Sequence, residues 1–147
     1  MEKNYYLVLK KLKIFSSHKI HLPDTLNLNL HSQSAFQRQL LKEKRRAERL
    51  NTKSSILIFD YSIYLSKNEN NSNSTVEDIL SSVCINLRDT DVVSPYNDNS
   101  IIILLPDTDN ASAQMVSNRI VNTIISKDMH SDENTSEYFQ LEILSYP

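Results

Sequence analysis

Glycine is missing from this sequence altogether, since none of its 147 residues is a glycine. The phosphate-binding loops of Walker-type and dinucleotide-binding folds need glycine, because their backbone adopts positive φ angles and approaches the phosphate closely. Neither loop is therefore present, and any nucleotide has to be held by side chains or by ordinary backbone.

Cysteine and long apolar runs are also scarce. The single cysteine, Cys84, provides no disulfide framework and no cysteine-ligated zinc cluster, which predicts a reducing, cytoplasmic location. No apolar run reaches the roughly 18 residues of a transmembrane helix, and the N-terminus lacks the apolar core of a signal peptide. The formal net charge of −2 argues against a general nucleic-acid binder. The histidines show no ligand spacing, so we expect no metal and no cofactor.

The apolar pattern predicts one α+β domain. Residues 32–50 read as a helix capped by Ser32 or Ser34, residues 55–59 as a buried strand, and residues 66–74 as a polar loop. A capping box at residues 74–77 opens a second helix, a hairpin turns near residues 96–100, and Asp109 or Asn110 caps a third helix. A last strand lies within residues 138–144. This order predicts a ferredoxin-like or palm-like antiparallel sheet with helices packed on it.

The N-terminal part and the first helix give weaker signals of structure and function. Residues 1–30 form an N-terminal extension with alternation typical of one or two strands, and residues 31–147 form the domain. In the first helix, Phe36, Leu40, Ala47 and Leu50 share one face. Its basic run, KEKRRAER, contains interleaved glutamates that favour ion pairs along the helix over nucleic-acid binding.

Three stretches carry a resemblance to a known family. They are "FQRQLLKEKRRAERLNTKSSILIFDYS", "ILSSVCINLRDTDVV" and "IIILLPDTDNASAQMVSNRI". In order and spacing they resemble the GGDEF domain, the diguanylate cyclase family, over residues 32–147. The resemblance implies a GGDEF-like fold whose hairpin tip carries Gly-Gly-(Asp/Glu)-Glu-Phe. Here the tip, residues 97–101, reads NDNSI, and every position of the signature differs.

The changed tip implies a degenerate, catalytically inactive member of the family with no catalytic residues. Asn99 stands where the family has a metal-binding carboxylate. Asp60 matches the family's other metal carboxylate, and it is either a magnesium ligand or a residue that ends a buried strand and caps a turn. The family's guanine-binding residues fall in the segment that residues 66–74 replace, and no counterpart is found there. We therefore expect no enzyme activity.

One family feature survives, the Arg-x-x-Asp product site. Arg88 and Asp91 lie at the family's spacing, with five residues between Asp91 and the signature position. Arg119, on the third helix, falls where the family often has a further arginine. An arginine fork pairs with the O6 and N7 edge of guanine or with a phosphate. The alternative is that the three residues are scaffold: Arg88 ends a helix, Asp91 caps a turn and Arg119 is a solvated helix residue.

Two functions of different classes follow. The first is a cyclic di-GMP receptor that uses Arg88, Asp91 and Arg119. In degenerate members of the family this role is tied to polysaccharide production or surface behaviour. The alternative is a nucleotide-independent protein-interaction or dimerisation domain that docks a protein partner or a second copy. Residual GTP binding is the third and least favoured reading.

Overall fold

A computed structural model describes residues 30–68, 72–128 and 135–146, apart from the side chains of residues 72–75. The strands predicted within residues 1–30 lie outside this part, as do the contacts of the predicted capping box at Ser74. The elements are, in order, α2 (Gln33–Leu50), β1 (Ser54–Asp60), α3 (Ser62–Lys67), α4 (Ser72–Ile85), β2 (Val92–Asn97), β3 (Ser100–Leu105), α5 (Asn110–Lys127), the 3-10 helix η3 (Thr135–Tyr138) and β4 (Gln140–Tyr146).

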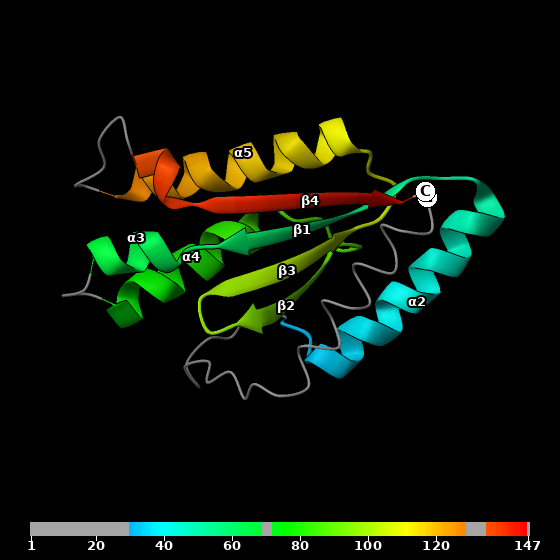
Figure 1. Cartoon of the computed structure of the whole chain (residues 1–147), viewed down its shortest axis with the longest axis horizontal. Coiled ribbons are helices and arrows are strands. Elements are labelled where there is room, and N and C mark those ends of the chain that lie inside the picture. The colour runs from blue at the N-terminus through cyan, green and yellow to red at the C-terminus, as the bar shows by residue number, and fades with distance from the viewer. Residues whose placement is uncertain (1–29, 69–71, 129–134, 147) are drawn as a thin grey trace.

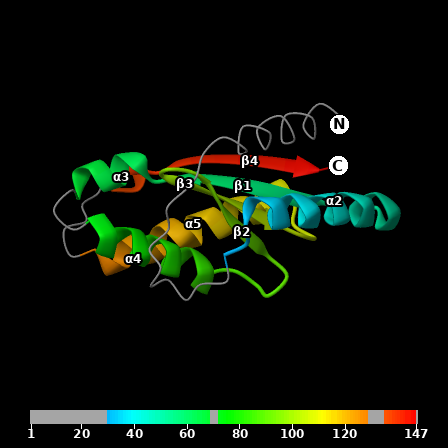
Figure 2. The same ribbon diagram turned by 90° about the horizontal axis from the view of Figure 1, so that it is seen from below.

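The strands form one antiparallel sheet in the order β2-β3-β1-β4 (Figure 1). Helices α4 and α5 lie together on one side of the sheet (Figure 2). Helix α2 packs its apolar side chains on the other face, against β1, β2 and β3. The expected α+β fold, an antiparallel sheet with helices packed on it, is confirmed.

Strand β1 is buried on both faces, which explains its unbroken apolar sequence. Leu57 and Phe59 point into the core under α4 and α5. Ile56 and Ile58 point the other way, against α2. Successive side chains of a strand alternate between the two faces, so one run of residues serves two cores.

Helix α2 confirms most of its predicted face and corrects one residue. Ser32 is its N-cap and accepts a hydrogen bond from the Ala35 N–H at 3.2 Å. Phe36, Leu40 and Ala47 are buried as expected. Leu50 is instead 54% exposed, because the helix ends there, beyond the sheet. A charged residue, Glu43, takes a buried position on the helix.

The predicted loop at residues 66–74 is wrong at both ends. Ser66 and Lys67 belong to α3, and α4 begins at Ser72, two residues before the predicted capping box. Helix α3 spans only six residues, which is too short for a helical period to stand out. The last strand also begins later than predicted, because Tyr138 ends η3. Within the described residues, no helix combines the length and apolarity needed to cross a membrane.

Candidate functional site

A tight turn built by Arg88 and Asp91 links α4 to β2. The Asp91 N–H donates to the Arg88 carbonyl at 3.0 Å. In return, the Asp91 carboxylate accepts from the Arg88 N–H at 2.7 Å. The helix already ends at Ile85, so Arg88 lies in this turn and not on the helix.

The guanidinium of Arg88 is held by a second set of contacts. Its Nη2 donates to Asp91 Oδ1 at 2.9 Å, to the Pro106 carbonyl at 2.8 Å and to Thr108 Oγ1 at 3.0 Å. The side chain of Arg88 is 54% exposed, whereas that of Asp91 is only 2% exposed. Asp91 therefore orients the arginine and does not present its carboxylate to solvent.

The Nη1 group of the Arg88 guanidinium takes no part in these contacts. An arginine has five N–H donors, two of them on Nη1. The contacts above use Nη2 and, at 3.4 Å, Nε. In the part of the chain that the structure describes, Nη1 has no hydrogen-bond partner. An anchored arginine with free donors is pre-organised to bind an acceptor, because little side-chain entropy remains to be lost.

Arg119 lies on α5 with its side chain exposed. One turn further along α5, Thr123 Oγ1 donates to the Arg119 carbonyl at 2.8 Å and accepts from Asn86 Nδ2 at 3.0 Å. This contact joins α5 to the segment just before Arg88. The Arg119 side chain makes no ion pair with any described residue.

The hairpin tip is closed by its own side chains. Asn97 Oδ1 accepts from the Asn99 N–H at 3.2 Å and from Ser100 Oγ at 2.5 Å. The Asn99 carbonyl accepts from the Tyr61 N–H at 2.9 Å, which ties the tip to the end of β1.

Asp60 ends β1 and hydrogen-bonds to Ser62, the first residue of α3. Its Oδ1 accepts from Ser62 N–H at 2.9 Å and from Ser62 Oγ at 2.6 Å. Among the described residues, no group of three or more His, Cys, Asp and Glu side chains is arranged to hold a metal ion. These contacts give Asp60 a structural role between β1 and α3, and the expectation that it holds no magnesium stays a prediction.

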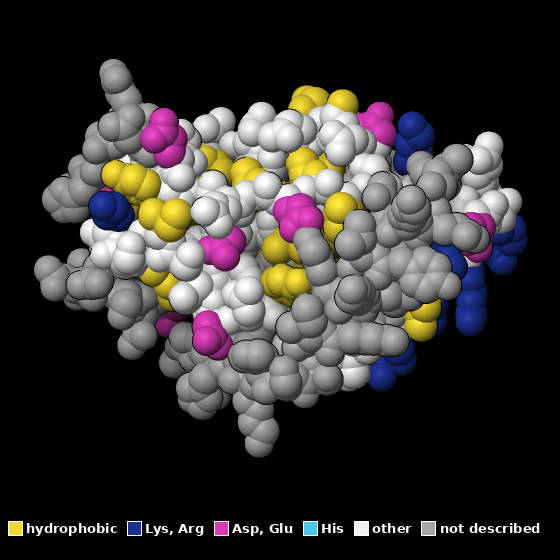
Figure 3. Space-filling view, in the orientation of Figure 1, with side chains coloured by type: hydrophobic (Ala, Val, Ile, Leu, Met, Phe, Trp, Pro, Cys, Tyr) yellow, Lys and Arg dark blue, Asp and Glu magenta, His cyan; other side chains and the backbone are white. Residues whose placement is uncertain are grey.

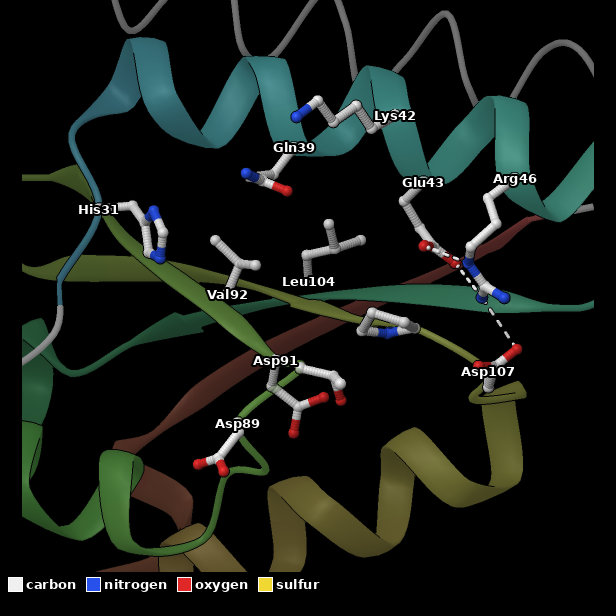
Figure 4. A pocket seen from close by; sticks show the side chains of 12 residues that line it. His31, Gln39, Lys42, Glu43, Arg46, Asp89, Asp91, Val92, Leu104 and Asp107 are labelled. Atoms are coloured by element: carbon white, nitrogen blue, oxygen red, sulfur yellow. Dashed lines mark hydrogen bonds and ion pairs between the residues drawn. The ribbon is translucent and has the colours of Figure 1, made fainter.

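A groove of about 590 Å³ separates α2 from the Arg88 turn (Figure 4). At one end Arg46 donates to Glu43 at 2.8 and 2.6 Å and to Asp107 Oδ1 at 2.9 Å. Hydrogen bonds to Glu43 and then to Asp107 raise the pKa of Arg46, and the bond from Arg46 lowers the pKa of Asp107. Lys and Arg side chains gather at the end of the molecule where α2 lies (Figure 3).

Sequence reasoning missed this network. The interleaved glutamates predict i,i+4-type pairs along the helix, and Glu43 instead pairs with Arg46 at i,i+3 spacing. Neither the burial of Glu43 nor its bond from Ser54 Oγ at 2.6 Å follows from that pattern. In the sequence, Asp107 and Thr108 stand out only as part of the run Leu-Pro-Asp-Thr-Asp, which resembles the GGDEF family. The positive φ of 51° at Asp107 could not be read from that run.

The comparisons with known proteins identify the family. The model described as "Diguanylate cyclase, GGDEF domain" matches residues 24–144, which is most of the chain. The chain therefore belongs to the GGDEF domain family. No curated protein matches the sequence. The predicted boundary between an extension and a domain at residue 31 stays a prediction.

Solved structures agree on the fold. A diguanylate cyclase protein from Thermotoga maritima superposes with a TM-score of 0.64 at 21% identity, covering 81% of this chain and 83% of that one. The GGDEF domain of DgcB from Caulobacter crescentus, in complex with c-di-GMP, superposes with a TM-score of 0.67 at 13% identity, covering 89% of this chain and 80% of that one. The diguanylate cyclase SiaD from Pseudomonas aeruginosa, in complex with its activator SiaC, superposes with a TM-score of 0.61 at 15% identity, covering 98% of this chain and 56% of that one.

Proposed function

We propose that this domain binds cyclic di-GMP at Arg88 and does not synthesise it. The observation that carries the proposal is the state of Arg88, which is anchored through Nη2 and whose Nη1 has no hydrogen-bond partner among the described residues. The Nη1 donors suit the O6 or N7 acceptor of a guanine or a phosphate oxygen. Asp91 acts by holding the guanidinium, and Arg119 supplies a second, exposed cation on α5.

The lack of synthesis is supported by the hairpin. Residues 97–101 carry none of the family signature, and Asn97 occupies the tip with internal hydrogen bonds. The Asp60 carboxylate is already engaged by Ser62. Phosphoryl transfer needs metal ions that bridge the phosphates and neutralise the developing charge, and Asn99 offers no carboxylate for one.

The cellular role and the partner that we propose for this domain rest on its resemblance to other proteins. The structure of DgcB was solved with c-di-GMP, and that of SiaD with a protein activator. By analogy we assign this domain a cytoplasmic signalling role that controls polysaccharide production or surface behaviour through a protein partner or a homodimer.

Thermal unfolding tests the proposal. A ligand that binds only the folded state stabilises it by about 2.7 kcal/mol at a hundred times its dissociation constant. Cyclic di-GMP should raise the unfolding midpoint of the wild type and leave that of Arg88→Ala unchanged. Cyclic di-AMP, which lacks the guanine O6, is the matched control ligand. Formation of cyclic di-GMP from GTP and Mg²⁺ by the purified protein would contradict the inactive assignment.

A nucleotide-independent interaction domain is the second candidate. Two large apolar side chains of α4 and α5 face solvent, Ile85 at 74% and Met115 at 65% exposure. Exposed apolar side chains on helices are typical of docking surfaces when they form a patch. Light scattering after gel filtration distinguishes this candidate: a dimer of the ligand-free protein that Ile85→Ser converts to monomer supports it, and a monomer in both proteins opposes it.

A further inference from the structure

The loop at residues 106–108, between β3 and α5, is hydrogen-bonded by arginine side chains from two sides. From one side, Arg88 Nη2 donates to the Pro106 carbonyl at 2.8 Å and to Thr108 Oγ1 at 3.0 Å. From the other side, Arg46 on α2 donates to Asp107 Oδ1 at 2.9 Å. Adjacent residues of one short loop therefore connect the Arg88 turn to the helix on the opposite face of the sheet.

This loop is stiff. Asp107 has a φ of 51°, in the left-handed region, which Asp and Asn adopt more readily than other residues with a Cβ. Thr108 is buried and bonded to both sides of the start of β1. Its N–H donates to the carbonyl of Lys53, just before the strand, at 3.0 Å, and its carbonyl accepts from Ser55 Oγ, within the strand, at 2.7 Å. Thr108 Oγ1 also donates to the Pro106 carbonyl at 2.8 Å.

On the α2 side the contact is an ion pair in which Arg46 is 30% and Asp107 is 55% exposed. Arg46 is bound by the buried carboxylate of Glu43, which accepts a further hydrogen bond from Ser54 Oγ at 2.6 Å. Figure 4 shows Glu43, Arg46 and Asp107 in one continuous chain of contacts at the end of the groove. A displacement of α2 along or away from the sheet therefore acts on Asp107 directly.

We propose that the loop at residues 106–108 positions Arg88, and that through Arg46 and Asp107 it couples the Arg88 site to α2. Asp107 and Thr108 are positioning residues, since neither needs to touch a ligand. Only the identity of the ligand rests on the proposed function. Coupling between sites is reciprocal, so an acceptor bound at Arg88 stabilises the contact between α2 and the loop, and undocking of α2 weakens binding at Arg88.

The ordering of the Arg88 side chain tests the coupling without any ligand. Asp107→Asn removes the charge that Arg46 binds and keeps both the Glu43 pair and a residue type that tolerates positive φ. Thr108→Val removes the hydroxyl with little change of shape. Asp98→Asn is the matched control, because Asp98 is exposed in the turn between β2 and β3, at the end of β3 away from the loop. The readout is the NMR order parameter of Arg88 Nε, assigned from its loss in Arg88→Lys.

We expect the Arg88 order parameter to be high in the wild type and in Asp98→Asn, and to fall below about 0.6 in Asp107→Asn and Thr108→Val. A value already that low in the wild type, or unchanged values in both loop variants, would overturn the proposal. A high value that falls in Thr108→Val alone would overturn the link to α2.

Binding measurements keep this inference separate from the proposed function. Cyclic di-GMP should bind Asp107→Asn about 5-fold or more weakly than it binds the wild type, and should bind Asp98→Asn equally well. Equal affinity in Asp107→Asn would overturn the coupling even if the wild type binds. If the wild type binds no cyclic di-GMP, the proposed function fails, and the order parameters still decide whether the loop positions Arg88.

Discussion

Replacing Arg46 with methionine should destabilise the domain through Glu43. The Glu43 side chain is 9% exposed and that of Arg46 is 30% exposed. The change leaves a buried carboxylate whose remaining hydrogen-bond donor, within the described ranges, is Ser54 Oγ. Breaking a fully buried pair costs about 3–5 kcal/mol. Because Arg46 is partly solvated and the Ser54 bond survives, we expect a loss of about 2 kcal/mol in the free energy of unfolding.

The double variant Glu43→Leu, Arg46→Met should recover most of that loss, since it removes the unpaired charge and fills the site with apolar groups. Urea unfolding followed by circular dichroism measures all the variants. Arg49→Met is the control, because Arg49 is exposed on the same helix. The reasoning is refuted if Arg46→Met costs no more than Arg49→Met, or if the double variant is less stable than Arg46→Met.

Three further predictions concern single residues. Ser32→Ala removes the N-cap bond to Ala35 and should lower the free energy of unfolding by about 1 kcal/mol in urea, whereas an unchanged value would contradict the cap. Arg46 lowers the pKa of Asp107 below its ordinary 3.8. The wild type should therefore be more stable than Asp107→Asn above pH 3.8, and acid titration should show this advantage shrinking as the pH falls further; a constant difference would contradict the pair. Burial raises the pKa of the Cys84 thiol, so Ellman's reagent should react more slowly with the folded than with the urea-unfolded protein at pH 8.

Most of the fold can be predicted from the sequence, because the strong signals for its helices and strands are local. The apolar run of β1, the Ser32 cap and the Asp109 cap, which accepts from Ser112 N–H at 2.8 Å, are each visible within a few residues. Helix α3 was missed because its six residues span fewer than two turns. The exposure of Leu50 depends on where α2 runs off the sheet, which no local pattern records.

Only part of the candidate site can be predicted from the sequence, for a different reason. The spacing of Arg88 and Asp91 brought that pair to attention, and the structure joins them at 2.9 Å. The remaining partners of Arg88 are a backbone carbonyl at Pro106 and a hydroxyl at Thr108. A carbonyl has no sequence signature, and a contact across eighteen residues depends on the register of the sheet. The burial of Asp91 follows from the same packing.

Titration calorimetry with cyclic di-GMP tests the central claim most directly. Wild type, Arg88→Ala and Arg38→Ala are compared, because Arg38 is an exposed arginine on α2 that serves as the matched control. We predict saturable binding to the wild type and to Arg38→Ala, and loss of binding in Arg88→Ala. The absence of saturable heat in the wild type, or equal binding in all three proteins, would contradict the assignment of Arg88 as the ligand site.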